Sequence, residues 1–259
     1  MDLEVLISTL ENDNGIKLYK KMNLVTDAII INQTDQVSYN KNIIDEKKVE
    51  IFSFNERGIG LSRTNALMRS SSDICVMADD DMVYRNEYKE TIINAYKNNP
   101  TADMIVFNVI VHKNGEKKET VKKNGKVRFI NCLSYGTVMF TFKRESILKN
   151  NITFSLLFGG GAKYGAGEDS LFIWEVLKAK LNVISSTEII ADVYNEESTW
   201  FKGYNDKYFY DKGALFRALS PKFYLFFIIQ FILRHKGKFN NDISRRNIFK
   251  IMRRGAIDY

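Results

Sequence analysis

Five short runs of apolar and β-branched residues recur along the first 109 residues, at 3–8, 27–32, 49–54, 73–78 and 104–109. Each run is almost continuously hydrophobic, which is typical of a strand that is covered on both faces. Amphipathic segments at 15–23, 61–71 and 85–98 separate the runs and have the period of a helix. The alternation predicts an α/β fold, a Rossmann-like and mostly parallel central sheet flanked by helices.

The pattern is less regular after residue 109. A charged segment with glycines, 112–126, predicts a solvated hairpin or loop, and 136–144 predicts a strand followed by a short helix. A glycine-rich loop at 158–167 leads into an amphipathic helix predicted over 168–180. Residues 182–186 and 188–194 predict two short edge strands.

The distribution of charge separates a basic C-terminal segment from the rest of the chain. The net charge is +7 over 259 residues, yet the residues from Arg217 onward hold ten basic and two acidic side chains, a net +8. The preceding 216 residues are therefore close to neutral, at −1. We predict a domain over residues 1–216 and a basic, amphipathic extension over 217–259.

The extension contains an apolar run at 223–233, with Ser220 as the expected helix N-cap and Pro221 at the first helical position. Its eleven residues are about half of the ~20 that a helix needs to cross a bilayer. Basic residues flank the run, which favours a helix lying on an anionic membrane surface. A helix packed on the domain is the alternative, and no basic–aromatic platform favours nucleic acid as a partner.

Two further features bear on location. The N-terminus has no basic segment followed by a long apolar one, so we expect no secretory signal and a cytoplasmic protein, peripheral on the inner face of the membrane. Cys75 and Cys132 are the only cysteines and lie in apolar surroundings, which predicts buried thiols in a reducing compartment.

Three consecutive aspartates, Asp79, Asp80 and Asp81, end the fourth apolar run. Like charges packed this closely repel one another, so the cluster needs a compensating partner. One explanation is a turn or cap leading into the helix at 85–98. The other is a hard divalent cation, Mg²⁺ or Mn²⁺, which takes one or two carboxylates together with phosphate oxygens.

A second acidic pair, Glu168 and Asp169, begins the predicted helix after the glycine-rich loop. Carboxylates are stabilised at a helix N-terminus by free amides and by the helix dipole, so capping alone would explain them. The loop ahead of them has more glycine than a cap requires. A loop that closes on a ligand, followed by a general base, is the functional interpretation.

In this order and spacing, four features resemble family 2 glycosyltransferases with the GT-A fold, particularly bacterial members that build capsular or other surface polysaccharides. They are a first strand ending in Ser8 and Thr9, the segment ERGIGLSRTNAL, the segment ADDD and the segment FGGGAKYGAGED. The resemblance spans roughly residues 3–215.

The resemblance implies roles for single residues. Asp81 and Asp79 would be the metal ligands, with Asp79 nearer the ribose, and Asp169 would be the catalytic base. Thr9 and Asp35 fall where the family contacts the base, and residues 62–65 where a helix lies under the nucleotide-sugar. The substrate-binding residues so implied are Ser8, Thr9, Asp35, Arg63, Asn65, Asp79, Asp80, Gly167 and Glu168.

The implied activity is an inverting transfer of a sugar, from a nucleotide-sugar with UDP as the expected nucleotide, to a hydroxyl of a saccharide acceptor. The resemblance also implies a lipid-linked acceptor and a divalent metal. The chain departs from the family in two places. Thr64, rather than Arg, precedes Asn65, and residues 189–200 lack the histidine that many members supply to the metal. Three explanations stay open: Asp192 takes the place of the histidine, a water does, or the metal binds weakly.

Other functions stay open at this point. The missing histidine also fits a non-catalytic nucleotide- or glycan-binding protein on the same fold, and the basic tail fits a tethering protein. The aromatic-rich segment 199–216 suits either a lid that stacks on sugar rings or ordinary packing of the C-terminal segments.

Overall fold

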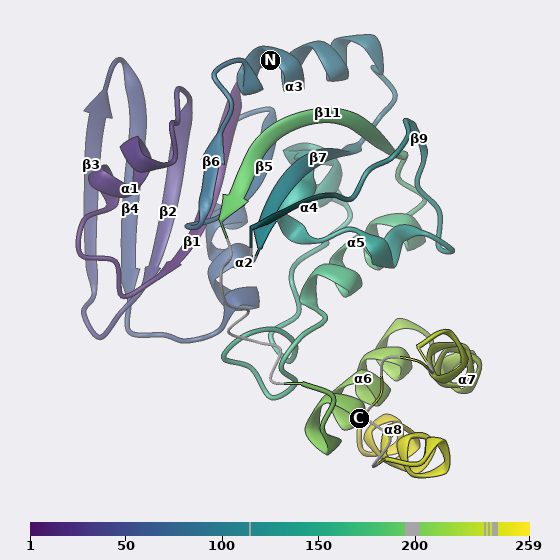
Figure 1. The fold of residues 1–259 in the computed structure, drawn as a ribbon. Helices are drawn as coiled ribbons and strands as arrows, with labels where there is room; N and C mark the ends of the chain where they lie inside the picture. The colour runs from purple at the N-terminus through teal and green to yellow at the C-terminus, as the bar shows by residue number, and fades with distance from the viewer. Residues whose placement is uncertain (114, 195–202, 236, 238, 240–242) are drawn as a thin grey trace.

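The computed structural model describes residues 1–113, 115–194, 203–235, 237, 239 and 243–259. An eleven-stranded sheet occupies the centre of the molecule (Figure 1). Its strands are β1 (Leu3–Leu10), β2 (Asp27–Gln33), β3 (Ser38–Ile44), β4 (Lys47–Phe54), β5 (Ile74–Asp79), β6 (Met82–Tyr84), β7 (Met104–Lys113), β8 (Glu116–Glu119), β9 (Gly125–Lys126), β10 (Phe140–Lys143) and β11 (Val183–Tyr194). They are ordered β3-β4-β2-β1-β5-β10-β7-β11-β6, with β8 paired to β7 and β9 to β11.

All five predicted strands form, and four of them, β4, β2, β1 and β5, are parallel neighbours. The prediction of a mostly parallel sheet is wrong, because the sheet is mixed: β3, β6, β8, β9 and β10 run antiparallel to their partners. One cause is a hairpin between β3 and β4. Asp45 and Glu46 connect the strands with φ of 46° and 64°, the mirror-image turn that suits the strand twist.

The C-terminal part of the sheet also differs from the prediction. In place of two short edge strands, β11 is one strand that lies inside the sheet, between β7 and β6. Its register against β7 shifts between Ser185 and Ile189. This irregularity lies where the sequence predicts a break between two strands, and it lets one strand continue through that point. The predicted hairpin over 112–126 is confirmed by the antiparallel pairing of β8 with the end of β7.

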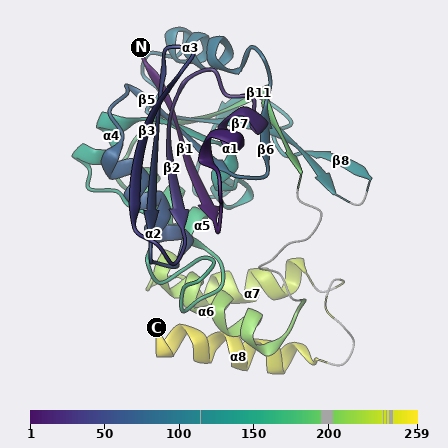
Figure 2. The ribbon, with the colours of Figure 1, turned by 90° about the vertical axis from the view of Figure 1, so that its left-hand side faces the viewer.

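Helices flank the sheet: α1 (Gly15–Lys21), α2 (Ile59–Arg69), α3 (Tyr88–Asn98), α4 (Arg144–Lys149) and α5 (Glu168–Lys178). In Figure 2, α1 and α4 lie on opposite sides of the strands. Short 3₁₀ turns at Cys132–Ser134 and Thr137–Met139 precede β10. The segment predicted over 136–144 is therefore a turn and a strand, with α4 as its helix.

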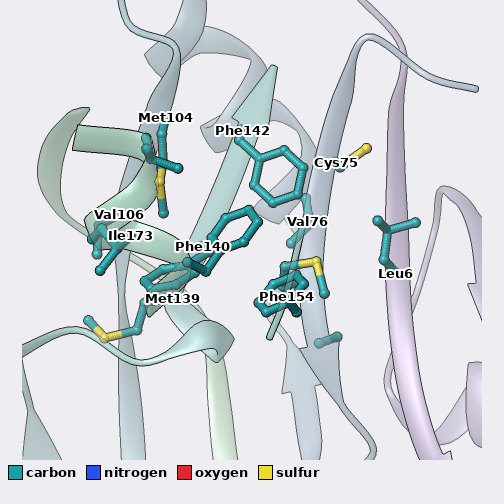
Figure 3. Packing of buried hydrophobic residues seen from close by; sticks show 14 of the residues in the cluster. Leu6, Cys75, Val76, Met104, Val106, Met139, Phe140, Phe142, Phe154 and Ile173 are labelled. Carbon is teal, nitrogen blue, oxygen red and sulfur yellow. The ribbon is translucent and has the colours of Figure 1, made fainter. Parts of the chain in front are cut away.

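Aromatic packing fixes α5 against the sheet. Phe140 and Phe142 lie on one face of β10 and pack near Phe154 (Figure 3). The Phe172 ring of α5 stacks on Phe154 with centroids 4.1 Å apart and an interplanar angle of 7°. All four rings are buried, so the start of α5 is held beside the end of β5. Cys75 is also buried, and burial raises its thiol pKa to about 12, as it does for Cys132.

Three further helices, α6 (Asp206–Leu219), α7 (Tyr224–Arg234) and α8 (Arg245–Asp258), gather at one end of the molecule (Figure 1). The predicted domain boundary at 216–217 falls within α6. The predicted N-cap is wrong: α7 begins three residues after Pro221, and the Ser220 oxygens accept from the Phe223 N–H in a turn instead. Among the described helices, none combines the length and hydropathy needed to cross a bilayer.

Helix α6 contacts α8 at very short range, and glycine makes this possible. A Cβ built on Gly213 would lie 1.9 Å from the Met252 carbonyl oxygen. The obstacle is backbone, which cannot rotate away as a side chain could. The two helices can therefore keep this separation only with glycine at position 213.

We expect Gly213→Ala to destabilise the protein by about 1–3 kcal/mol, because overpacking outweighs the gain of about 1 kcal/mol in helix propensity. The measurement is the urea midpoint of unfolding followed by circular dichroism. Gly125→Ala is the control, since a Cβ there meets nothing within 4 Å. If the urea midpoint of Gly213→Ala equals or exceeds that of the unmodified chain, α6 and α8 can move apart without loss of stability, and the prediction is wrong.

Candidate functional site

A cleft of about 590 Å³ opens where the carboxyl ends of β1 and β5 meet the N-terminal ends of α2 and α5. The parallel register places Ser8 of β1 opposite Asp79 of β5, so both strands end at the same edge. This edge is the usual ligand-binding position in wound α/β sheets. The residues lining the cleft are Ser8, Thr9, Leu10, Gln33, Arg57, Gly58, Ile59, Arg63, Asp79, Asp80, Asp81, Gly136, Thr137, Val138, Gly160, Gly161, Glu168, Asp169 and Tyr194.

The three aspartates occupy different environments. The Thr9 hydroxyl donates to Asp80 Oδ2 at 2.5 Å, which fixes Asp80 to the end of β1. Asp81 Oδ1 is buried and accepts no hydrogen bond from the described residues. Burial, and then the charges of Asp79 and Asp80, raises the pKa of Asp81 from 3.8 to about 6. The Asp81 carboxylate is therefore the group in this cluster that most lacks a partner.

Arg63 of α2 joins the two acidic motifs. Its guanidinium donates to Asp79 Oδ1 at 2.8 Å and to Glu168 Oε1 at 2.8 Å, and its side chain is 5% exposed. Burial alone lowers the pKa of Arg63, but the Asp79 and Glu168 charges more than offset this and raise it. One buried cation thus links the end of β5 to the start of α5.

Glu168 and Asp169 occupy the first turn of α5, as predicted. Burial, and then the charge of Asp169, raises the pKa of Glu168 against the opposing effect of Arg63. Asp169 Oδ1 accepts from the Ser170 N–H at 2.6 Å. Gly136 lies beside the other oxygen, since a Cβ there would be 3.6 Å from Asp169 Oδ2. Asp169 therefore faces the cleft with a small residue as its neighbour.

The glycine-rich loop is fixed at both ends. On the α2 side, the Ile59 N–H donates to the Gly160 carbonyl at 2.9 Å, and a Cβ on Gly60 would meet the Ser155 carbonyl oxygen at 2.0 Å. On the other side, Asp211 of α6 accepts from the Gly165 N–H at 2.9 Å. The sequence analysis did not identify Asp211. The burial of Asp211 on α6 becomes evident only in the structure.

Most of the predicted site residues come together. Eight line the cleft: Ser8, Thr9, Arg63, Asp79, Asp80, Asp81, Glu168 and Asp169. Gly167 lies next to them with φ of 127°, packed against Leu215, and does not line the cleft. Its N–H donates to Glu168 Oε2 at 3.1 Å.

Two predicted residues lie elsewhere. The Asp35 side chain is 84% exposed and pairs with Arg57 at 2.9 Å, outside the cleft. Asn65 points to Glu56 and Arg69 on the outer side of α2. The cleft is lined instead by residues that the prediction omitted, among them Gln33, Arg57 and Tyr194. Arg57 belongs to the quoted segment ERGIGLSRTNAL, which was the available signal.

Asp192 does not replace a metal-binding histidine. Its two oxygens are engaged by Arg85 at 2.7 Å and by His112 Nε2 at 2.6 Å, and it does not line the cleft. Strand pairing explains this, because β11 aligns Asp192 with Val83 of β6. Residues 195–200 of the segment predicted to lack a histidine lie outside the described residues.

The aromatic-rich segment is described from residue 203 onward, so residues 199–202 lie outside the described part. Within it, the Tyr204 ring contacts the rings of Phe209 and Phe239, with centroids 6.2 and 5.4 Å apart. Phe209 is fully buried. These rings support the packing alternative for the described part of the segment.

The oxygen ligands in the cleft suit a divalent cation, although the described residues supply only part of its coordination shell. No cluster of three or more His, Cys, Asp or Glu suited to a metal occurs in the part of the chain that the structure describes. The unpartnered oxygen of Asp81 and the neighbouring carboxylate of Asp79 are hard ligands. Mg²⁺ and Mn²⁺ commonly take one or two carboxylates and complete their shell with substrate oxygens.

Comparison with known proteins gives the following matches. A protein-family model described as glycosyl transferase family 2 matches residues 27–160, just over half of the chain. Curated protein sequences give no match. Among solved structures, S. aureus TarS 1–349 in complex with UDP-GlcNAc has a TM-score of 0.64 at 13% identity, covering 97% of this chain and 76% of that one. The same protein in complex with UDP has a TM-score of 0.59 at 12% identity, covering 97% and 70%.

We expect Arg63→Met to destabilise the fold by about 2–4 kcal/mol, because it leaves the largely buried Glu168 and the half-buried Asp79 as uncompensated charges. The matched control is Lys149→Met, which breaks the exposed Lys149–Glu145 pair on α4 and should cost under about 1 kcal/mol. Urea unfolding of the two variants measures the difference. Equal losses would mean that Arg63 contributes no more than a surface cation.

Asp81 should make stability depend on pH. Its folded pKa, about 6, lies above the unfolded value, so its contribution is complete below pH 3.8 and is lost as the pH rises through 6. In metal-free buffer we expect Asp81→Asn to raise the stability at pH 7.5 by roughly 1–2 kcal/mol after screening, and to change it little at pH 4. Thermal melting at the two pH values measures this. A gain of the same size at both would exclude Asp81 as the titrating group.

Proposed function

Because the chain belongs to glycosyl transferase family 2, we propose that it transfers a sugar from a nucleotide-linked donor to an acceptor hydroxyl, with inversion at the anomeric carbon. The observation that supports this best is that Asp81 and Asp169, from distant parts of the sequence, line one cleft. One end of the cleft supplies carboxylates for a cation and a diphosphate. The other supplies a carboxylate at a helix N-terminus, next to open space.

We propose UDP as the nucleotide of the donor. The similarity to the fold of a protein that binds UDP-GlcNAc and UDP supports this choice. In this proposal the base lies near Thr9 and Arg57, at the end of β1. Ser8 and Arg63 lie deeper in the cleft, where Ser8 is already fixed by the Ser62 hydroxyl at 2.9 Å.

The proposed metal is Mn²⁺ or Mg²⁺, held by Asp81 and Asp79 together with donor oxygens. When bound, it would supply electrostatic stabilisation of the leaving diphosphate. Asp79 keeps its contact with Arg63, which limits the negative charge that gathers around the diphosphate. Asp80 stays bound to Thr9 and orients the turn that presents Asp81.

Asp169 is the proposed general base. It accepts the proton of the acceptor hydroxyl while that oxygen bonds to the anomeric carbon and the bond from this carbon to the diphosphate oxygen breaks. Base and leaving group lie on opposite faces of the sugar, so one displacement inverts the configuration. Burial lowers the pKa of Lys212 on α6, and the charge of Asp169 opposes this lowering, so the two groups interact electrostatically.

The acceptor proposed is a saccharide carried on a lipid, at the inner face of the bacterial membrane, in the synthesis of a surface polysaccharide. The basic tail supports this assignment, because it suits an enzyme that works beside anionic lipid. The neutral body of the chain gives no competing signal for a polyanionic partner.

A non-catalytic nucleotide-binding protein is the second candidate. It is favoured by one observation, that Arg63 occupies both oxygens of Asp79 while the described residues supply no third metal ligand. This candidate predicts that the chain binds UDP and Mn²⁺ without releasing sugar from any donor.

Asp169→Asn tests the proposal directly. We expect sugar transfer, or slow donor hydrolysis, to fall by at least about 100-fold, because a positioned base contributes about 10²–10⁴. UDP binding measured by calorimetry with Mn²⁺ should stay within about twofold, since the proposed partner of Asp169 is the acceptor hydroxyl and not the nucleotide.

Asp45→Asn is the control, the same substitution in the exposed β3–β4 turn. Turnover in Asp169→Asn that equals the control would reject the assignment of the base. Binding of UDP by the unmodified chain, without turnover across a panel of nucleotide-sugars, would support the second candidate.

A further inference from the structure

Helix α7 has two apolar faces, and only one of them is packed. Ile228, Phe231 and Ile232 are buried against the neighbouring helices. The opposite face exposes large side chains that a soluble helix normally keeps from water. These are Phe223, which immediately precedes the helix, Leu225, Phe226, Ile229 and Leu233.

A second exposed apolar element lies next to α7. It is the loop ending in the 3₁₀ turn Cys132–Ser134, where Ile130 is 91% exposed and Phe129 and Leu133 are more than 40% exposed. Trp174 of α5 connects the two elements. Its ring lies 4.6 Å from the Phe129 ring and 5.8 Å from the Phe227 ring of α7, centroid to centroid. The loop and α7 therefore share one side of the domain.

Helix α8 adds positive charge at the same end of the molecule. Beside α7, it exposes Arg245, Arg246, Lys250, Arg253 and Arg254. The single acidic residue of α8, Asp258, pairs with Arg254 at 3.6 Å. Figures 1 and 2 show α7 and α8 together, on the end of the molecule remote from the β3 edge.

We propose that α7, α8 and the 129–133 loop form one docking surface for an anionic phospholipid bilayer. Apolar side chains on α7 and the loop would enter the headgroup region, and the α8 cations would meet lipid phosphates. The charge argues against a second copy as the occupant. A symmetric pair through this face would place one basic α8 near another, with few carboxylates to compensate.

The surface also lies close to the cleft along the chain. The loop residue Leu133 is followed by Gly136, Thr137 and Val138, which line the cleft on the Asp169 side. A lipid-carried acceptor would therefore approach the proposed base from the membrane. This last step rests on the proposed function, whereas the docking surface itself does not.

The test is co-sedimentation of the full chain with phosphatidylcholine vesicles, with and without phosphatidylglycerol. We expect binding to be at least about tenfold tighter with phosphatidylglycerol and to weaken in high salt. Two double variants should each lower the partition coefficient onto these vesicles by at least about tenfold. They are Phe226→Ser with Ile229→Ser on α7, and Lys250→Glu with Arg253→Glu on α8. Ile130→Ser should show a smaller loss in the same direction.

Ile43→Ser is the matched control, because Ile43 on β3 is 66% exposed at the remote edge of the sheet. It should bind vesicles as the unmodified chain does. Unmodified chain that stays in the supernatant, or α7 and α8 variants that bind equally well, would overturn the proposal. Light scattering could instead show a dimer that the double variant Phe226→Ser with Ile229→Ser converts to monomer. That result would show that this face binds a second copy of the chain and not a bilayer.

Donor hydrolysis measured on the same samples without vesicles separates this proposal from the enzymatic one. The surface variants should hydrolyse the donor at the unmodified rate, since none of them lines the cleft. Vesicle binding without any hydrolysis would support the surface and count against the transferase.

Discussion

The buried guanidinium of Arg63 is the interaction on which the site depends. It lies in α2 and bonds to Asp79 at the end of β5 and to Glu168 at the start of α5, so three elements from separate parts of the chain meet at one cation. Five carboxylates line the cleft, in two groups at residues 79–81 and 168–169, and Arg63 bonds to one carboxylate of each group. Its charge does not neutralise them all, and Asp81 is left with a raised pKa and an unpaired oxygen. The remaining negative charge is what the proposed divalent cation would compensate.

The mixed topology of the sheet makes this meeting possible. Strand β10 runs antiparallel between β5 and β7, and its Phe140 and Phe142 rings provide the surface on which Phe172 of α5 packs. That packing places the first turn of α5 beside the carboxyl end of β5. A purely parallel sheet would need a crossover helix at this position. The departure from the expected topology is therefore part of what assembles the site.

Local patterns predicted the N-terminal half well, because buried parallel strands are continuous apolar runs and their ends hold the polar residues. They failed for β3 and β6, which are short or polar, and for β11, whose register shift resembles two strands. Eight site residues were predictable from motifs that end strands or begin helices. Asp35 and Asn65 do not line the cleft, because a motif fixes the position of a residue in the chain but not the direction of its side chain. Asp211 could not be found, since its role arises from packing between segments far apart in sequence.

The C-terminal helices are structurally joined to the cleft. Asp211 of α6 holds the Gly165 amide, Leu215 of the same helix packs against Gly167, and α6 is in turn in backbone contact with α8. A cut at the predicted boundary would thus remove α8 from the helix that supports the glycine-rich loop. The same helices expose the apolar and basic residues of the proposed docking surface. One set of contacts therefore serves both regions, because α6 contacts the glycine-rich loop ahead of Asp169 and also packs against α8.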